Sequence, residues 1–435
     1  MKILFFSPVL LGSLLVSVGS LTAQTWTPTT APSNSWFTVA SSADGSKLIA
    51  ASGGSSAGGL FTSANSGATW IPTPAPITNW YAVASSADGV KLVAVAGGGP
   101  IIKGLIYTSA NSGQTWTTTS APSNYWYTVA SSADGTKLAA AGSLNKFTPL
   151  YLSTDSGSTW LPNSLPPMNW RALALSPDGS KIAALAGGLN GAFFSSTNFG
   201  TTWTSNALPN INIQAFAASA DMTKMVAVTY GPSPGPIYSS VNSGVTWTPT
   251  TAPNNYWASV AASADGSRVA AVANGGGIFT STDFGATWVS NNAPVTAWSA
   301  VAASADGGKL VAGVNNGGIY TLQTTVPPVL TLKSMAGGQA LSWVITSTNF
   351  VLQQGSSLNA ADWSALPLNP TFNPANLHNE LILPAGSGSG FYRLRTPYAV
   401  GPSCRSACPT ASRQRRPTRS NCIPPHPKTK SESVS

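Results

Sequence analysis

The sequence predicts an all-β fold assembled from seven copies of one four-stranded repeat, and three observations lead to this prediction. A Ser-Ala-Asp-Gly-x-Lys element recurs along the chain, charged residues make up only 8% of it, and Gly, Pro and Trp are abundant. Short apolar runs bounded by Gly- and Pro-containing turns are typical of strands. Self-similarity at a regular period indicates a repeat architecture.

The Asp of this element recurs every 41 to 46 residues, at Asp44, Asp88, Asp134, Asp178, Asp221, Asp265 and Asp306. In the second copy, residues 80–84 and 91–95 are predicted to be two strands joined by the Asp88-Gly89 turn, and 105–108 and 115–118 to be the third and fourth. A Lys or Arg stands three positions after each Asp, and we expect the two to pair across the hairpin. Exposed pairs contribute about 0–1 kcal/mol each, so we interpret the element as structural.

The last copy ends with its third strand, Ile319-Tyr320-Thr321, and has no fourth. A matching Thr-Trp strand, Thr25-Trp26-Thr27-Pro28, lies at the other end of the repeat array. We therefore expect the N-terminal strand to complete the last copy, because such pairing closes the ring and removes exposed sheet edges. The predicted fold is a seven-bladed β-propeller over residues 24–325.

The turn between the third and fourth strands has the pattern Ser-x-(Asp/Asn)-x-Gly-x-Thr-Trp in six copies, at 63–70, 109–116, 153–160, 196–203, 240–247 and 281–288. It resembles the Asp-box (BNR repeat) of sialidase-like, sortilin-like and photosystem II assembly factor-like propellers. The sortilin-like resemblance implies peptide or protein ligands, and the assembly-factor resemblance implies a role in assembly. The motif itself does not indicate an activity, because it is a structural turn in proteins of unrelated function.

Four of the six boxes hold Asn in place of Asp, at Asn65, Asn111, Asn198 and Asn242. Asn and Asp share a side-chain oxygen that accepts backbone N–H bonds in a turn, but they do not share a charge. The position therefore requires an acceptor, and we predict that its role is structural.

Residues 24–325 contain nine Asp, all in these two turns, and no Glu, His or Cys. A glycosidase needs two carboxylates or an equivalent nucleophile and acid. Triads and His/Cys metal sites need residues that are missing here. The sialidase resemblance implies an arginine cluster, yet only Arg171 and Arg268 are present. We predict no enzymatic activity, no catalytic or metal-binding residues and no cofactor, with a sialidase-like glycan hydrolase as the alternative.

Six tryptophans open the first strands, eight residues before the turn Asp, at Trp36, Trp80, Trp126, Trp170, Trp257 and Trp298. Their recurrence favours packing between blades. The alternative is an aromatic ring at the channel mouth that stacks on sugars or holds peptides.

The position after these tryptophans does not repeat: it holds Phe37, Tyr81, Tyr127, Arg171, Gln214, Ala258 and Ser299. Lys103 and Lys146, in irregular loops on the same face, are with Arg171 the only cations of residues 24–325 outside the repeated position. We predict a ligand-binding surface, and the alternative is a set of ordinary solvated loop residues. The predicted surface comprises Phe37, Tyr81, Tyr127, Arg171, Lys103 and Lys146.

The segments on either side of the repeats predict an export signal, a small β-sandwich-like module and a basic tail. Residues 1–23 have the pattern of a signal peptide cleaved after Ala23, so the destination is the periplasm, the cell surface or the medium. No later segment is long and apolar enough to span a bilayer. Residues 326–397 predict a small β-sandwich-like module. Residues 398–435 predict a disordered basic tail, or alternatively a reading-frame artefact.

These features together predict a secreted, monomeric, non-enzymatic binding or scaffold protein. Its ligand is unknown, with a protein, a peptide or a carbohydrate as the candidates. The net charge of +9 does not indicate a nucleic-acid partner, because residues 398–435 alone carry seven Lys/Arg against one Glu.

Overall fold

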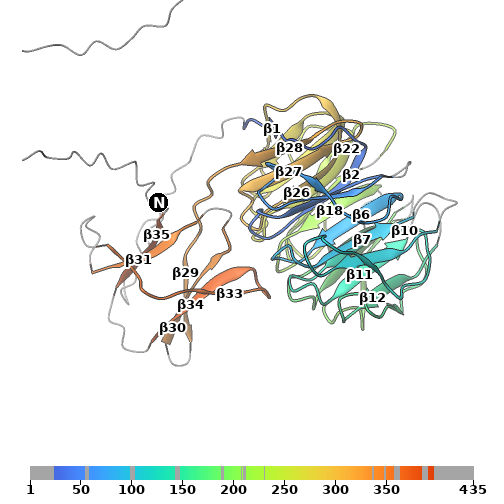
Figure 1. Ribbon diagram of the computed structural model, residues 1–435. Coiled ribbons are helices and arrows are strands. Elements are labelled where there is room, and N and C mark those ends of the chain that lie inside the picture. The colour runs from blue at the N-terminus through green and yellow to red at the C-terminus, as the bar shows by residue number, and fades with distance from the viewer. Residues whose placement is uncertain are drawn as a thin grey trace, which may run out of the picture. The chain divides into compact units, whose positions relative to one another are not determined.

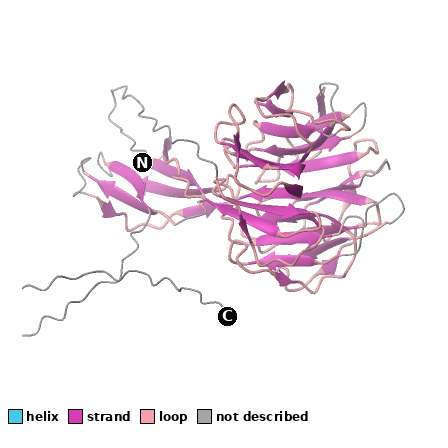
Figure 2. Cartoon of the chain, turned by 90° about the horizontal axis from the view of Figure 1, so that it is seen from above, coloured by secondary structure: helices cyan, strands magenta, loops and turns pink. Residues whose placement is uncertain are grey.

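A computed structural model describes residues 24–53, 58–97, 103–142, 147–187, 191–206, 208, 212–229, 231–335, 338–346, 349–356, 363–384 and 390–395. The predicted signal peptide (1–23) and basic tail (398–435) lie outside the described residues. Within these ranges, the chain contains only strands and connecting loops (Figure 2). Accordingly, none of the described segments is a helix that could cross a membrane.

The strands of residues 27–323 fall into seven four-stranded sets, called repeats 1 to 7. Repeats 1 to 3 comprise β2 (Trp36–Ser41), β3 (Leu48–Ser52), β4 (Leu60–Ser63) and β5 (Ile71–Pro72); β6 (Trp80–Ser85), β7 (Leu92–Ala96), β8 (Ile106–Ser109) and β9 (Thr117–Thr118); and β10 (Trp126–Ser131), β11 (Leu138–Gly142), β12 (Leu150–Ser153) and β13 (Leu161–Pro162). Repeats 4 and 5 comprise β14 (Trp170–Leu175), β15 (Ile182–Ala186), β16 (Ala192–Ser196) and β17 (Thr204–Asn206); and β18 (Ile213–Ala218), β19 (Met225–Thr229), β20 (Ile237–Ser240) and β21 (Thr248–Pro249). Repeats 6 and 7 comprise β22 (Trp257–Ala262), β23 (Val269–Gly276), β24 (Ile278–Ser281) and β25 (Val289–Ser290); and β26 (Thr296–Ala303), β27 (Lys309–Val314), β28 (Ile319–Gln323) and β1 (Thr27–Pro28).

The chain is a β-propeller closed by its N-terminal strand, as the sequence predicts. Strand β1 pairs antiparallel with β28, placing Thr27 opposite Thr321 and Pro28 opposite Tyr320; Figure 1 shows the blue β1 beside β28. The first strands of successive repeats lie side by side in one ring, in which β26 also lies beside β2. Strand β23 extends to pair with β26, so repeats 6 and 7 form one continuous eight-stranded sheet.

Each repeat becomes less buried from its inner strands to its outer edge. Five of the second strands, such as β7 with Leu92 and Val93, are buried at every residue because both faces are covered, and β23 and β27 are buried over five residues each. The fourth strands are only two or three residues long and mostly exposed. Several end in Pro, which cannot donate to a neighbouring strand and so discourages edge-to-edge pairing. They are β1, β5, β13 and β21.

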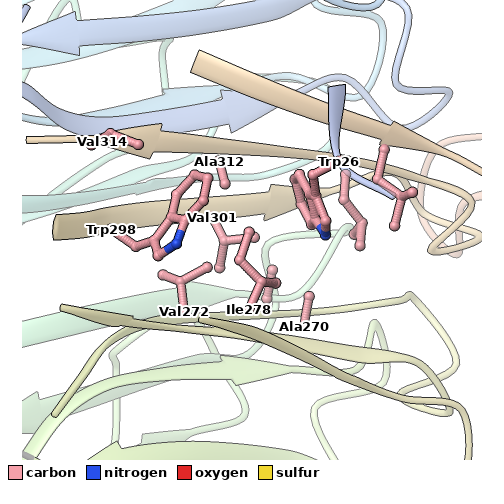
Figure 3. Packing of buried hydrophobic residues seen from close by; sticks show 11 residues of the cluster. Trp26, Ala270, Val272, Ile278, Trp298, Val301, Ala312 and Val314 are labelled. Carbon is pink, nitrogen blue, oxygen red and sulfur yellow. The ribbon is translucent and has the colours of Figure 1, made fainter. Parts of the chain in front are cut away.

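The hydrophobic core lies between neighbouring repeats, and the first-strand tryptophans fill much of it. All six of these tryptophans are at most 2% exposed, which confirms the packing interpretation and rules out a stacking ring at the channel mouth. At the closure, Trp26 lies 6.3 Å from Trp298 between ring centroids. Figure 3 shows both side chains packed with Val272, Ile278 and Val301 in one cluster. This burial ties β1 to repeats 6 and 7.

The connections define two ends of the propeller. At the turn end, the Asp-box turn bonds to the Asp-Gly turn of its own repeat, as in Ser112 N to Val90 O at 2.8 Å. At the loop end, the second-to-third-strand loop pairs with the connection that enters the next repeat, as at Gly104 and Asn124.

The turn cations contact the next repeat, so the predicted Asp–Lys pair across each hairpin is not their main contact. Arg268 interacts with Asp306 of the next repeat and, to a smaller extent, with its own Asp265. Burial raises the pKa of Asp134 in repeat 3, but hydrogen bonds from Ser132 and Thr136 and the charge of Lys91 from repeat 2 lower it, and the net pKa is lowered. A Cβ built on Gly135 would lie 2.8 Å from Lys91 Cβ, so the aliphatic stem lies directly on this glycine. This contact fastens neighbouring repeats together.

A ring of backbone hydrogen bonds also joins the turn ends. The residue before each turn Asp donates its N–H to the same position of the next repeat, as in Ala43 N to Ala87 O at 2.8 Å. Six of the seven steps around the ring make this bond, including Ala305 N to Ala43 O at 2.7 Å between the last repeat and the first. The step from repeat 4 to repeat 5 is missing, because Pro177 has no N–H.

The described residues after the repeats form two sheets, as predicted for a small β-sandwich-like module. One sheet contains β29 (Thr331–Met335), β30 (Gly338–Val344), β34 (His378–Pro384) and β33 (Thr371–Asn373); the other contains β32 (Ser364–Ala365), β31 (Val351–Gly355) and β35 (Phe391–Arg395). Leu341 and Trp343 of the first sheet share a buried cluster with Leu352 and Tyr392 of the second. The module therefore has its own core.

Candidate functional site

The Asp of each Asp-Gly turn is held by its own turn. Asp44 Oδ1 accepts from Ser42 Oγ at 2.7 Å and from the Ser46 N–H at 3.0 Å, and all seven copies make the same two bonds. Burial pushes the pKa of Asp44 upward, but the hydrogen bonds from Ser42 and Ser46 and the charge of Lys309 outweigh it, so the pKa is lowered. The carboxylate stays charged at neutral pH.

The Asp-box carboxylates and amides occupy the same geometry. Asp155 Oδ1 accepts from the Thr159 N–H at 2.8 Å and its Oδ2 accepts from Thr159 Oγ1 at 2.7 Å. At Asn65 the oxygen accepts the Thr69 N–H at 2.8 Å, while Nδ2 donates to Thr69 Oγ1 at 2.9 Å. The threonine hydroxyl reverses its role, which explains why both residue types fit.

No raised carboxyl pKa is found among the Asp residues whose shifts are resolved. In all seven the pKa is lowered, at Asp44, Asp134, Asp155, Asp178, Asp221, Asp265 and Asp283. A glycosidase general acid needs the opposite, a pKa raised enough to hold a proton near neutrality. Within the described residues there is also no cluster of three His, Cys, Asp or Glu that could hold a metal ion.

The residue after each first-strand tryptophan is a β-bulge. In repeat 2, Trp80 pairs with Ala96 and Ala82 with Val95, so Tyr81 has no partner on the second strand. The same register shift occurs in all seven repeats. Bulges re-aim a side chain and are frequent beside functional sites. The non-repeating position singled out in the sequence is therefore a distinct structural position at the loop end.

Four bulge residues from repeats 1 to 4 form one continuous row, called the bulge arc: Phe37, Tyr81, Tyr127 and Arg171. Ring centroids of Phe37 and Tyr81 lie 5.2 Å apart, edge to face, and those of Tyr81 and Tyr127 lie 5.7 Å apart. The Arg171 guanidinium carbon lies 5.9 Å from the Tyr127 ring centroid. The structure thus brings together four of the six predicted site residues.

Exposure differs along the arc. Tyr81 is only 8% exposed, and burial, followed by the neighbouring Tyr127, raises its pKa. Tyr127 and Arg171 are half-buried. Tyr81 is therefore a packing support, contrary to its predicted place on the rim, and Tyr127 and Arg171 form the accessible end.

Arg171 lies across Gly187 of the second-to-third-strand loop. A Cβ built on Gly187 would lie 2.5 Å from Arg171 Cγ and 2.8 Å from its Nε. The glycine therefore permits this side-chain position. Among the described residues no carboxylate pairs with Arg171, because every Asp of residues 24–325 belongs to a turn at the opposite end.

The two lysines of the predicted surface are not part of the arc. Lys103 is exposed and its Nζ lies 5.8 Å from the Tyr125 ring centroid, so it lies on the connection into repeat 3. Lys146 lies outside the described residues.

The loop end also carries exposed apolar side chains that the sequence did not single out. Ile77 is 72% exposed and Phe147 is 76% exposed, in loops of the same repeats that supply the arc. Ile77 has a counterpart in Val295, which is 77% exposed before repeat 7, whereas Phe147 lies in an irregular loop. Neither position belongs to a motif that would mark it as a binding residue. Gly187 was missed for another reason: its contact with Arg171 joins a bulge to a loop 16 residues away, and only the folded chain reveals it.

No protein-family model matches the chain, and no curated protein matches it. Several solved structures are similar in fold. One is the Niastella koreensis GH74 enzyme, with a TM-score of 0.54 and 15% identity over 74% of this chain, which spans 59% of that protein. A second is YCF48 bound to D1 peptide, with a TM-score of 0.54 and 14% identity over 71% of this chain and 98% of that one. YCF48 from Cyanidioschyzon merolae gives a TM-score of 0.53 and 15% identity over 69% of this chain and 99% of that one. At these identities the likeness establishes the β-propeller fold alone.

Proposed function

We propose that this chain is a secreted, monomeric, non-enzymatic binding or scaffold protein that holds a protein, peptide or glycan ligand at the loop end of a seven-bladed Asp-box-type propeller. Each repeat is one blade in this proposal, and residues 1–23 direct export. The observation that carries it is the bulge arc. Four neighbouring repeats depart from the internal symmetry at one structural position, and their side chains contact one another there.

The residues that recur from repeat to repeat have structural roles, which leaves the non-repeating positions as candidates for ligand binding. A residue type that recurs at one repeat position serves the repeat, as the turn Asp does in all seven repeats and the first-strand tryptophan in six. The arc is a contiguous set of side chains at a position that does not repeat, and binding residues often lie at such variable positions on a rigid scaffold. A propeller of similar fold has been solved bound to D1 peptide, which is a precedent for peptide binding by this architecture.

The second candidate function is glycan hydrolysis, favoured by the fold similarity to the GH74 enzyme. It requires a paired acid and nucleophile or base, and the carboxylates of residues 24–325 all lie in turns. The assignment as a non-enzyme is therefore the stronger proposal. Hydrolysis of any member of a glycan panel by the purified protein, abolished by Asp155→Asn or Asp283→Asn, would reverse this order.

The test compares ligand capture by three versions of the mature protein. Wild type, the Tyr127→Ala/Arg171→Ala variant and a Gln214→Ala control are immobilised, then probed with a glycan array and with the exported proteins of the producing cell. Gln214 is a bulge residue outside the arc, so this control changes the same structural position. We expect a ligand retained by wild type and Gln214→Ala and lost by the arc variant. Equal capture by all three proteins would refute the loop-end site.

A further inference from the structure

The charges of the propeller are segregated between its two ends. The turn end holds nine carboxylates and seven Lys or Arg, and these groups interact with one another as described above. The loop end holds Arg171 and Lys103, and no carboxylate in the described part of the chain. Unlike the turn cations, Arg171 has no carboxylate among its described neighbours.

A cation without a protein partner, held in place by packing, is suited to an anionic ligand. The stem of Arg171 lies on Gly187 and its guanidinium carbon lies 5.9 Å from the Tyr127 ring centroid, so packing limits the freedom that the guanidinium loses on binding. A planar guanidinium recognises a carboxylate through two parallel hydrogen bonds. Lys103 extends the positive charge along the same face.

The packing of the arc rings and the burial of the first-strand tryptophans favour a peptide ligand over a glycan. Sugar stacking requires a flat, exposed aromatic face, but the loop-end tryptophans are at most 2% exposed and the arc rings contact one another edge-on or tilted. Ile77 and Phe147, at 72% and 76%, are exposed large apolar side chains at the same end, and Phe147 is the aromatic one of the two. Exposed apolar groups beside a polar anchor are typical of protein-binding surfaces.

We propose that the loop end over repeats 1 to 4 binds an acidic, apolar peptide segment, in which a carboxylate pairs with Arg171 while apolar side chains pack on Tyr127, Ile77 and Phe147. This inference deepens the proposed function and rests on it. In this proposal a ligand carboxylate is recognised by the guanidinium of Arg171 at a defined position, and general attraction to a basic surface is not sufficient.

The experiment measures fluorescence polarisation of labelled decapeptides binding to the purified mature protein. One peptide contains two Glu, two Leu and one Phe among Ser and Gly, and its partner replaces both Glu by Gln. Protein variants are Arg171→Gln, Arg171→Lys, Gly187→Ala and, as a charge-matched control, Lys333→Gln, because Lys333 is an exposed cation outside the propeller. Circular dichroism and thermal melting establish that each variant is folded.

We expect wild type and Lys333→Gln to bind the Glu peptide at least about tenfold more tightly than the Gln peptide. Arg171→Gln should bind both peptides equally, and Arg171→Lys should recover only part of the preference because it lacks the planar fork. Gly187→Ala should reduce the preference although the charge is retained, since the new methyl group displaces the Arg171 stem. This last variant separates positioning from charge.

Equal binding of both peptides by wild type, or a preference that survives Arg171→Gln, would overturn the inference while leaving a loop-end site intact. If an oligogalacturonate binds through Arg171 and neither peptide binds, the peptide proposal is overturned and the ligand class is an acidic glycan. If no probe binds and the Tyr127→Ala/Arg171→Ala variant captures ligands as wild type does, the proposed loop-end binding function is refuted as well.

Discussion

Lys309 of the last repeat lies across Gly45 of the first, and this contact fastens the closing junction of the ring. A Cβ on Gly45 would lie 2.9 Å from both Cβ and Cδ of Lys309. The Lys309 ammonium donates to the Asp44 carbonyl oxygen at 3.3 Å. Equivalent contacts join Lys47 to Gly89 and Lys137 to Gly179. The recurring spacing of Asp and Lys or Arg, with Gly after the Asp in every repeat except repeat 5, where Met222 takes its place, therefore serves contacts between repeats.

Gly45→Ala should destabilise the protein more than a glycine replacement without a neighbour. Gly45 has φ of +67°, and Gly275 has φ of +71° with nothing within 4 Å of a built Cβ. Both variants bear the cost of about 1–2 kcal/mol for a left-handed Ala, and only Gly45→Ala also displaces Lys309. We expect a difference of about 1 kcal/mol or more in urea unfolding. Equal losses would show that the lysine contact does not constrain the turn.

Trp26→Ala should release the N-terminal strand. Trp26 is 3% exposed and packs on Trp298, so its truncation should cost about 3–5 kcal/mol. Trp160→Ala is the control, because Trp160 is similarly buried but lies within a repeat whose strands are continuous in the chain. Limited proteolysis should cleave near residue 30 only in Trp26→Ala. Cleavage there in both variants, or in neither, would contradict closure through β1.

Acid should unfold the protein through its turn carboxylates. Seven Asp have folded-state pKa values below the ordinary 3.8, so their stabilising effect is complete above that pH and is lost as the pH falls through the lowered values. The Tm should be nearly constant from neutral pH to about 4 and should fall steeply below. A Tm independent of pH down to pH 2 would contradict the assignment.

Asp155→Asn should leave the Tm at neutral pH within about 2 °C of wild type. Four of the six boxes already hold Asn, and the threonine hydroxyl accepts from an amide as readily as it donates to a carboxylate. Asp155→Ala, which removes the acceptor, should lower the Tm. A large decrease in the Tm of Asp155→Asn would show that the carboxylate charge stabilises the turn, which the turn geometry does not require.

Pro177→Ala should supply the missing step of the backbone ring. The new amide can donate to the Ala220 carbonyl, as Ala133 N donates to Pro177 O at 2.8 Å. Hydrogen exchange of the amide at 177 should then be as slow as that at 133. Fast exchange at 177 would show that the first strands of repeats 4 and 5 are too far apart for this bond.

The repeat architecture could be predicted in detail because each local signal is independent and recurs. Strand positions, both turns and the closure by Trp26 all follow from comparing copies of one pattern. The partner of each lysine could not be predicted, because a spacing of three residues fits a contact across the hairpin as well as one to the next repeat. Only the packing of Lys309 on Gly45 decides between them.

The candidate site could be predicted in part. The failure of one position to repeat drew attention to Tyr127 and Arg171, and the folded chain shows that this position is a bulge. The burial of Tyr81 and the support of Arg171 by Gly187 depend on side-chain packing between strands and loops, for which the sequence has no periodic signal. Lys103 illustrates the opposite error: it shares the loop end but contacts Tyr125 instead of the arc.

The central claim is that ligand binding occurs at the loop end of repeats 1 to 4. Amide hydrogen exchange of the full-length mature protein, with and without the captured ligand, tests it most directly. We predict new protection at residues 36–38, 80–82, 126–128 and 170–172, with none at the Asp-Gly turns. Protection confined to the turn end around Asp44, Asp88 and Asp134 would contradict the account.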